Sequence, residues 1–598
     1  MNPLFAESVH AELAYLQQLL DEYSAGHKKV ASRLRYQGND ASNAATARLS
    51  QAFAFLLART QRRIDDECPQ ILKPLSDLIG MPGPATVPSL ATVEFVVSPD
   101  QAPDGSGGIV PRGTTLESDP VRGVPIRFRT CSDVFVWPIE LMSATLEFPP
   151  FRKSSPTASA ATCAVRLSLR TLASNLTFSD LALDHLRFFI HGALDDALWL
   201  YHSLFADAVE VTVESTGGTS VSLSPSALSP GGFSPRESLF PGISYDGARP
   251  LVEFLSFPDK FLFFELHGLA SILPQLSGSD LEINIYLRSS KDTMPRRLMP
   301  GAVRLHCTPV INLFERATSP IELKTRSDRL PLVVDSEFPK AFEIHAVNQV
   351  RRRDSKNVES ELPRYHALRR FAGSAQGGPQ WEYDTLEQTA TTERGTVVGL
   401  RFVNENFAPF KLGDCAVSAN VTCSNGDYVR ELPSGDDGCL LRAEALPFVS
   451  ECRCLAPPTR PRRLRLSHSM WERAEQRVPD LLTLASAQGA AALRSEIQKL
   501  ACDEDVVLQS LISSLSDVRM TRSTGIFDGQ MLCHGVDLVL IFRRMARLAR
   551  GQLLLVRVLQ DLLAQYATEG VIFRLSSQYE DGEEILRCPA RSGARPVI

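Results

Sequence analysis

The chain has 598 residues, with 63 Lys and Arg against 69 Asp and Glu, a formal net charge of −6 at pH 7 and 44% hydrophobic residues. This length suits about four domains and excludes a hormone or a disulfide-stapled mini-protein, and the ordinary composition excludes a disordered or collagen-like chain. A weakly acidic chain gains little from a phosphate backbone, so nucleic acid is not expected as a partner.

Membrane insertion and export are not expected either. The most apolar run, 553–566, contains Arg557 and Asp561, whose burial in a bilayer would be costly. The first thirty residues carry four acidic side chains, where a signal peptide needs a basic start and an apolar run. The one close cysteine pair, Cys452 and Cys454, has no second ligand pair at zinc-site spacing. We therefore expect a cytoplasmic protein with buried free thiols and without a cofactor or metal.

The N-terminal part is predicted to be helical. Apolar residues recur at intervals of 4, 3, 4 and 3 and line one face of a helix, namely Val9, Leu13, Leu16, Leu20 and Tyr23. A second helix is predicted from Ala44 to Cys68, and it ends there because Pro69 cannot continue it. Its apolar side carries Leu49, Phe53, Leu56 and Ile64.

A proline-rich spacer follows this helical segment. Met81–Pro88 holds three prolines and one glycine. Because proline lacks a backbone N–H and stiffens the chain, this stretch is predicted to be a domain boundary and a candidate hinge. Residues 1–88, the helical segment and its linker, therefore form the first predicted domain.

The middle of the chain is predicted to be β-rich. After the spacer the apolar period changes from 3.6 to 2, which is typical of half-buried strands. In a predicted domain at 89–330, the alternation runs through 93–97, 165–169, 209–213 and 281–287. In a second predicted domain at 331–460, it runs through 342–347 and 398–402. Five phenylalanines between Phe254 and Phe264 are interpreted as core.

The last predicted domain, 461–598, mixes helices and strands. A strand at 536–542, a helix at 553–567 and a strand at 571–575 predict a βαβ unit. The helix residues expected to pack on its sheet are Leu555, Leu559, Leu562 and Leu563. The predicted fold class is thus multidomain α+β, with a helical N-terminal segment, β-rich middle domains and a mixed C-terminal domain.

Motifs of catalysis are missing from the sequence. It has no GK dipeptide for a phosphate loop, no G-x-S-x-G elbow and no H-E-x-x-H zinc motif. His185, His191 and His202 could gather beside a strand at 186–190 and hold a metal, but ordinary surface histidines are the favoured interpretation. The arginine cluster 460–465 lacks interleaved aromatic residues and is interpreted as a solvated face or a protein contact. A binding or structural role gains by elimination, and the alternative is a β-rich carbohydrate-binding or hydrolytic protein.

Several ordered motifs resemble the TssF family (ImpG, VasA) of type VI secretion baseplate subunits. The most specific are Phe257–Phe264, with the sequence FPDKFLFF, and Cys307–Arg316, with the sequence CTPVINLFER, followed by Pro320–Ile321. Shorter matches are Glu12–Leu16, Phe53–Leu57, Ile64–Glu67, Val110–Thr114, Val136–Pro138, Leu432–Pro433, Pro457–Pro461 and Leu553–Tyr566. The segment 466–520 departs from the family's usual pattern.

The resemblance implies a structural protein of the phage-tail wedge type and not an enzyme. In such a wedge, two TssF-like copies join one TssG and assemble with TssE and TssK around the VgrG hub. The wedges seed the tail tube and the contractile sheath, and other subunits connect them to the inner-membrane complex. The implied location is the cytoplasmic side of the inner membrane, at the docked baseplate.

Partner contacts are expected at the apolar helix faces. A heptad-like spacing suggests that the N-terminal helices join helices of partner subunits in a bundle, and the alternative is that they pack inside their own helical domain. The leucines of the C-terminal helix are further candidates. The candidate partner-interface residues are Leu13, Leu16, Leu20, Phe53, Leu56, Leu555, Leu559 and Leu562.

Overall fold

The computed structural model describes most of the chain between residues 86 and 593 and parts of the N-terminal region. The described residues are 9–10, 12–16, 19, 48–49, 51–60, 86–98, 107–151, 160–173, 176–215, 220–240, 247–276, 278–288, 297–323, 330–354, 357–365, 379–390, 393–404, 409–433, 439–443, 446–463, 488–500, 506–527, 531–544, 550–565, 567–568 and 570–593.

The chain divides into two compact units. Unit 1 comprises Met1–Gly80, Arg364–Phe410 and Arg465–Glu475. Unit 2 comprises Met81–Pro363, Lys411–Leu464 and Gln476–Ile598. The first unit boundary therefore lies at the start of the proline-rich spacer, whereas the second predicted β-rich domain, 331–460, is split between the two units.

Unit 1 contains helices and one β-hairpin. The described residues of both predicted N-terminal helices, 9–19 with gaps and 48–60 without residue 50, are helical. Strands β22 (Gln380–Ala390) and β23 (Glu393–Val403) pair antiparallel along their whole length. Trp381 is buried in this hairpin and lies under the Arg364 guanidinium, 5.9 Å from its ring centroid.

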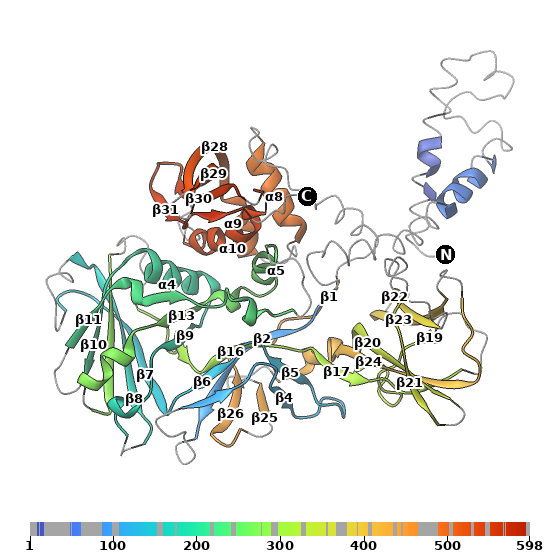
Figure 1. Cartoon of the computed structure of the whole chain (residues 1–598), viewed down its shortest axis with the longest axis horizontal. Helices are drawn as coiled ribbons and strands as arrows, with labels where there is room; N and C mark the ends of the chain where they lie inside the picture. The colour runs from blue at the N-terminus through green and yellow to red at the C-terminus, as the bar shows by residue number, and fades with distance from the viewer. Residues whose placement is uncertain are drawn as a thin grey trace. The chain divides into compact units, whose positions relative to one another are not determined.

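Unit 2 is built around a closed six-stranded barrel (Figure 1). Its strands, in the order β16-β2-β26-β25-β4-β5, include segments more than 300 residues apart in the sequence. Their bounds are β2 (Leu90–Val97), β4 (Thr115–Ser118), β5 (Arg127–Thr130), β16 (Cys307–Ile311), β25 (Leu440–Ala443) and β26 (Val449–Cys454). Because β25 and β26 complete a barrel begun by β2, the predicted boundary at 330/331 separates strands that share one core.

Two antiparallel sheets enclose the largest apolar core. The five-stranded sheet, in the order β11-β10-β14-β8-β7, contains the strands predicted at 165–169, 209–213 and 281–287. Its bounds are β7 (Ile139–Glu147), β8 (Cys163–Thr171), β10 (Ala208–Ser215), β11 (Ser220–Leu223) and β14 (Asp280–Leu287). The four-stranded sheet consists of β12 (Leu228–Pro230), β13 (Phe263–Leu266), β9 (Leu186–Ile190) and β15 (Val303–Leu305). Helices α4 (Leu194–Ala206) and α5 (Arg249–Ser256) add to this core.

A further sheet of unit 2 is organised by the central strand β24. Strand β24 (Cys415–Ser424) pairs with β17 (Phe314–Ala317), β18 (Ile321–Glu322) and β20 (Glu343–Asp354), and β20 pairs with β21 (Glu359–Leu362). Shorter elements are β1 (Thr86–Val87), β3 (Gly108–Val110), β6 (Val134–Val136), β19 (Leu330–Pro331) and β27 (Arg462–Arg463). The 3-10 helices are η3 (Phe178–Asp180), η4 (Pro225–Ala227), η5 (Pro235–Glu237), η6 (Pro258–Phe261), η7 (Leu269–Ser271), η8 (Leu273–Gln275) and η11 (Gly426–Glu431).

The spacer is held in place where the structure describes it. Residues Thr86 and Val87 form β1 and pair with Arg463 and Arg462 of β27. Val87 is also buried. The C-terminal end of the predicted hinge is therefore a paired strand. Thr86 and Val87 are not prolines, so their backbone N–H groups can take part in strand pairing between Pro84 and Pro88.

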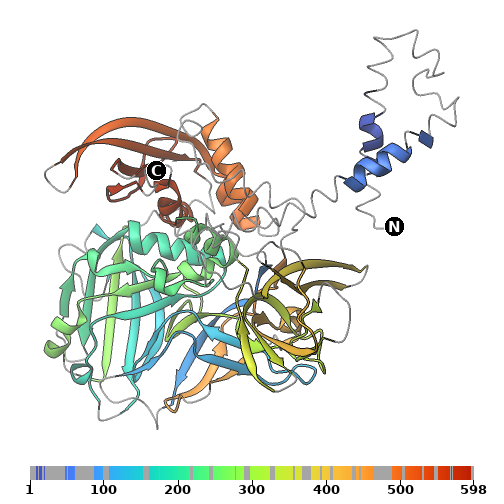
Figure 2. The same ribbon diagram turned by 45° about the vertical axis from the view of Figure 1, so that its right-hand side comes forward.

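The C-terminal part contains the predicted βαβ unit. Strands β29 (Met531–Phe542) and β30 (Ile572–Tyr579) are parallel neighbours, and α10 (Gln552–Ala564) connects them. Figure 2 shows the long antiparallel pair of β28 (Leu515–Phe527) and β29 extending beyond the rest of this sheet. The remaining elements are α8 (Gly489–Leu500), α9 (Val506–Ser513), β31 (Glu584–Arg587) and β32 (Arg591–Ser592). The α+β class predicted from the sequence is confirmed.

The C-terminal elements share one core with the two sheets of the middle region. Helix α10 packs against α4 and α5 as well as against β30 and β31, and in Figure 1 α5 lies between the sheets and the red C-terminal elements. Arg557 donates a hydrogen bond of 3.0 Å to the Tyr201 hydroxyl, and Arg550 one of 3.0 Å to Ser203 Oγ. The predicted boundary at 460/461 therefore does not separate independent cores.

This packing corrects part of the predicted partner interface. Leu555 and Leu559 are 1% and 0% exposed, and Leu562 is half-buried against the same core. The first two side chains have no surface left for another subunit, because α10 is enclosed by elements of its own chain. Their role is internal packing, as the βαβ prediction required.

Buried histidines predict acid sensitivity. Burial lowers the pKa of His306 from its ordinary 6.5 to about 4, and the same holds for His202 and His345. His306 Nε2 also accepts a hydrogen bond of 3.1 Å from the Trp137 backbone N–H, which a proton at Nε2 would abolish. The unfolded chain takes up these protons below about pH 6.5, but the folded chain only below about pH 4. As the pH is lowered from about 6.5 to about 4, the free energy of unfolding should therefore decrease by ~1.4 kcal/mol per pH unit for each histidine.

Thermal unfolding between pH 7 and pH 4.5 measures this effect. His306→Asn should show a shallower fall in Tm with acid than the parent, because asparagine tolerates the left-handed backbone at this position (φ 53°) and does not titrate. Exposed His534→Asn is the matched control. Equal slopes for His306→Asn and the parent would contradict the assignment.

Candidate interaction surfaces and their supports

The FPDKFLFF motif supplies the cation of a buried charge cluster. Lys260 is 1% exposed and forms an ion pair with Glu253 of α5, which is 0% exposed. Arg249, one helical turn before Glu253, adds a second cation 3.5 Å from the same carboxylate oxygen. We call Arg249, Glu253 and Lys260 the anchor cluster. Burial lowers the pKa of Lys260, and the Glu253 carboxylate opposes that shift.

The anchor cluster fixes a long loop as well as α5. The other oxygen of Glu253 accepts hydrogen bonds from Ser238 Oγ (2.9 Å) and from the Leu239 backbone N–H (2.8 Å). Arg249 donates to the backbone carbonyls of Ser234 (3.4 Å) and Phe233 (3.3 Å). Since a buried carboxylate is tolerated only when its lone pairs are satisfied, these contacts give the loop 233–239 one fixed position.

Gly232 belongs to the same arrangement. Its φ of +88° lies in the left-handed region, and a Cβ atom at this position would come 2.2 Å from the Lys260 carbonyl oxygen. Only glycine allows the loop backbone to approach the Lys260 turn so closely.

The CTPVINLFER motif joins the barrel to the sheet around β24. Asn312 and Asn425 are both 0% exposed and bind each other through side-chain and backbone groups. Asn312 Nδ2 donates to Asn425 Oδ1 (2.9 Å), and the Asn425 N–H donates to Asn312 Oδ1 (2.8 Å). Asn425 Oδ1 also accepts from the Arg127 N–H of β5 (3.0 Å). Both family motifs thus stiffen junctions inside unit 2.

An exposed apolar surface lies on the second N-terminal helix. Leu49, Phe53 and Leu56 are 60%, 54% and 54% exposed, and their spacing of four and three residues places them on one face. We call these three residues the helix stripe. On another side of the helix, Ala54 and Ala58 are buried. Large apolar side chains gathered on one helix face make this surface a candidate for contact with another protein.

The first N-terminal helix is less exposed at the predicted positions. Leu13 and Leu16 are half-buried, and Leu20 lies outside the described residues. Leu19, which is not one of the residues of the predicted apolar face, is 41% exposed.

Sequence patterns did not reveal a second exposed apolar pair. Ile109 and Phe135 lie opposite each other in the β3–β6 hairpin and are 53% and 46% exposed. Phe135 meets the His185 ring edge-on, and His185 stacks on His267 at 5.5 Å. No local signal predicts this group of side chains, because its four members come from four separate strands and loops.

The three candidate metal histidines are not brought together. His185 stacks on His267, His191 contacts Phe189, and His202 lies half-buried in α4. Across the described ranges, no three His, Cys, Asp or Glu side chains gather closely enough to hold a metal ion.

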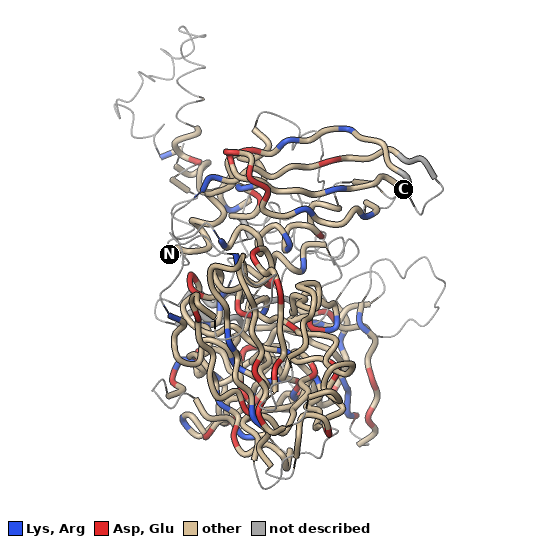
Figure 3. Tube along the Cα trace, turned by 90° about the vertical axis from the view of Figure 1, so that its left-hand side faces the viewer, with Lys and Arg blue, Asp and Glu red and all other residues tan. Residues whose placement is uncertain are grey.

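The arginine cluster 460–465 is partly neutralised within the chain. Arg463 forms ion pairs with Glu343 (2.8 Å) and Asp427 (3.1 Å), and Arg462 donates to the Leu255 carbonyl. Arg465 lies outside the described residues. Figure 3 shows basic and acidic residues interspersed along the described trace. In the part of the chain that can be described, helices both long and apolar enough for a membrane span are absent.

Comparison with known proteins gives concordant results. The family model "Type VI secretion system, TssF" matches residues 1–595. The chain is 28% identical to the type VI secretion system component TssF1 of Pseudomonas aeruginosa in an alignment of 627 positions that covers both chains completely.

Two solved assemblies contain chains of similar fold. One is a cryo-electron microscopy structure of a type VI secretion system TssK-TssF-TssG baseplate subcomplex, with a TM-score of 0.70 at 21% identity. That match covers 92% of this chain and 100% of the other. The second is a baseplate complex from the type VI secretion system, with a TM-score of 0.59 at 17% identity, covering 99% and 100%.

The anchor cluster predicts a large stability loss on removal of its lysine. Lys260→Met should cost about 3–5 kcal/mol, because the Glu253 carboxylate stays buried with a single, more distant cation. Thermal and denaturant unfolding of the purified chain measure the loss. The matched control is Lys411→Met at an exposed position, which should change stability by about 0.5 kcal/mol at most. Similar unfolding midpoints for both variants would show that the cluster is dispensable.

Proposed function

The chain belongs to the TssF family of type VI secretion systems, and from this premise we propose that it acts as a structural wedge subunit of the secretion baseplate. The full-length match to the TssF family model is the single observation that carries this conclusion. The similar folds found in two baseplate assemblies agree with it.

The physical organisation of the chain suits such a role. A subunit that passes force between neighbours needs stiff bodies and broad contact faces more than a reactive pocket. Unit 2 supplies stiffness through the continuous core and the anchor cluster. Unit 1 supplies an exposed apolar helix face.

We extend this proposal to the partners. By analogy with the solved subcomplex, direct partners are TssG and TssK proteins of the same secretion system. The further proposed neighbours in the wedge are a second copy of this chain, TssE and the VgrG hub. Other subunits mediate the proposed contact with the inner-membrane complex. The proposed location is the cytoplasmic side of the inner membrane.

The helix stripe is the proposed docking site for partner helices. Leu49, Phe53 and Leu56 lie exposed along one helix face, as is required of one helix in an intermolecular helical bundle. Burying three such side chains stabilises an interface by about 1.5–3 kcal/mol each. Leu13 and Leu16 of the first helix are half-buried and are assigned to the edge of the same bundle.

We propose that the chain performs this role without catalysis. The family assignment supports a structural component. The competing class is a β-rich carbohydrate-binding or hydrolytic protein. Such a protein would bind or turn over a small molecule, and a triple alanine variant of His185, His191 and His202 would lose that activity.

The docking proposal predicts a specific loss of complex formation. Phe53→Asp combined with Leu56→Asp should abolish co-purification with the TssG partner, because two carboxylates would be buried in an apolar interface. The yield and Tm of the isolated chain should stay unchanged, since both side chains are more than half exposed. Co-expression followed by affinity purification and size exclusion measures the outcome.

The control for that experiment is Gln51→Asp, an exposed polar position on another side of the same helix. It should retain the partner. If the double aspartate variant also retains the TssG partner at normal stoichiometry, the helix stripe is not the docking site.

A second prediction concerns the isolated chain. Without partners, the exposed apolar side chains should drive self-association, and the TssG partner should suppress it. Multi-angle light scattering across a concentration series measures this. A monodisperse monomer at all concentrations would contradict the idea of an uncovered interface.

A further inference from the structure

Two of the described cysteines lie directly opposite each other. Nine cysteines in the described residues are free and buried. In the barrel, β25 and β26 pair with Leu440 opposite Arg453 and Leu441 opposite Cys452. The same register continued by one residue places Cys439 opposite Cys454. The Cys454 N–H donates a hydrogen bond of 2.9 Å to the Cys439 carbonyl, which confirms the pairing.

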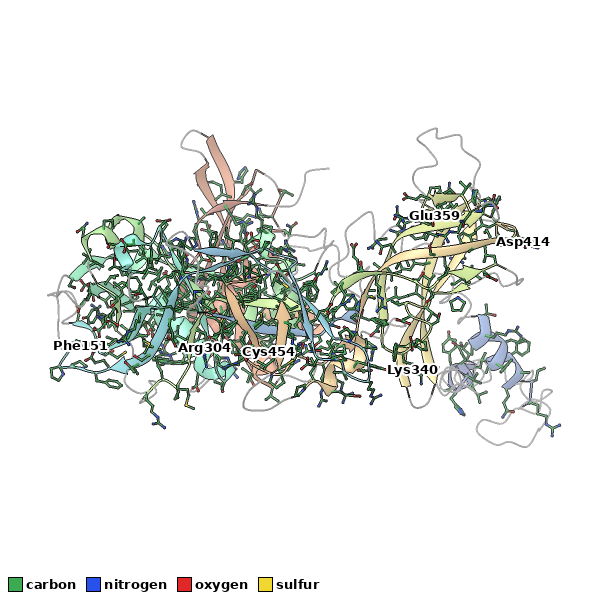
Figure 4. The ribbon with its side chains drawn as sticks, turned by 90° about the horizontal axis from the view of Figure 1, so that it is seen from below. Phe151, Arg304, Lys340, Glu359, Asp414 and Cys454 are labelled. Atoms are coloured by element: carbon green, nitrogen blue, oxygen red, sulfur yellow. The ribbon has the colours of Figure 1, made fainter. Side chains whose placement is uncertain are left out.

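The spacing of this thiol pair suits a disulfide. Directly opposed residues of antiparallel strands have Cα atoms about 4.5–5.5 Å apart, within the range of about 4.4–6.8 Å that disulfides need. Both side chains face the barrel interior, and a hydrogen bond links their sulfur atoms. Cys454, labelled in Figure 4, lies at the end of β26 among the barrel strands.

Cys439 differs in acidity from the other described cysteines, because its pKa is lowered while theirs are raised. The hydrogen bond from the Cys454 thiol lowers the pKa of Cys439, and the same bond raises the pKa of Cys454. Burial raises the pKa of Cys131 and Cys423 to about 12. The neighbouring Cys452 is shifted equally far by its own burial. Because the thiolate is the nucleophile, Cys439 is the thiol best prepared to react.

We propose that Cys439 and Cys454 form a redox-sensitive pair that hydrogen peroxide converts to a disulfide joining β25 to β26. The Cys439 thiolate attacks one peroxide oxygen, the O–O bond breaks, and Cys439 becomes a sulfenic acid while the leaving oxygen takes up a proton to give water. The Cys454 sulfur then displaces the hydroxyl of that sulfenic acid, which leaves as a second water. In balance, two thiols and one peroxide give one disulfide and two waters.

The disulfide would close the barrel covalently at one seam. It would link Cys439, directly before β25, to Cys454, the last residue of β26. A cross-link of this kind restricts the unfolded chain, so the oxidised protein resists unfolding more than the reduced protein. The modification therefore protects barrel geometry under oxidative stress and needs no change in the folded state.

The test uses the purified full-length chain treated with hydrogen peroxide at graded concentrations. Peptide mapping by mass spectrometry without reduction should find a Cys439–Cys454 cross-linked peptide as the first intramolecular disulfide. The Tm should rise on oxidation and return to its starting value with dithiothreitol. Cys439→Ser and Cys454→Ser should each abolish both the cross-linked peptide and the rise in Tm.

Cys423→Ser is the matched control, because Cys423 is a buried cysteine of the adjacent sheet with a raised pKa. It should keep the cross-link and the rise in Tm. The proposal is overturned if Cys439 and Cys454 both remain reduced when other cysteines of the folded chain are oxidised, or if the cross-linked peptide forms only after denaturation. Peptide mapping of the chain without substitutions is enough to decide between these outcomes, so the test does not depend on whether a serine variant folds.

Discussion

The ion pair between Glu253 and Lys260 is the constraint on which the middle of the molecule depends. The Glu253 carboxylate is fully buried, where an unpaired charge would be costly, so the groups that bind it are held in place. Through this one side chain, helix α5, the Lys260 turn and the loop 233–239 acquire a single relative position. Because α5 packs on α10, the constraint reaches the C-terminal elements.

The rigid junctions described above lie in unit 2, and the helix stripe lies in unit 1. In unit 2 the side chains of Asn312 and Asn425 are buried and hydrogen-bonded to each other's chain segment. In unit 1 the described helix presents Leu49, Phe53 and Leu56 to solvent. Such an arrangement fits the proposed assembly role, since a stiff body preserves the geometry of a contact face before a partner binds.

Most of the elements predicted from local periodicity are present in the structure. The alternation at 281–287 became β14, and the apolar run after 553 became α10 between two parallel strands. The same information misassigned Leu555 and Leu559, because an apolar stripe on a helix looks alike whether its cover is another subunit or the same chain. The anchor cluster had a usable signal, a lysine inside a run of phenylalanines, but its partner Glu253 could not be chosen without the fold.

The sequence alone determined the α+β class, the types of the main elements and the family, because these depend on periodicities and motifs contained in short segments. Tertiary structure decided how distant segments combine. It closed the barrel with β25 and β26, divided the chain into two units and set Cys439 opposite Cys454. Such contacts depend on the packing of residues far apart in the chain, which no local pattern specifies.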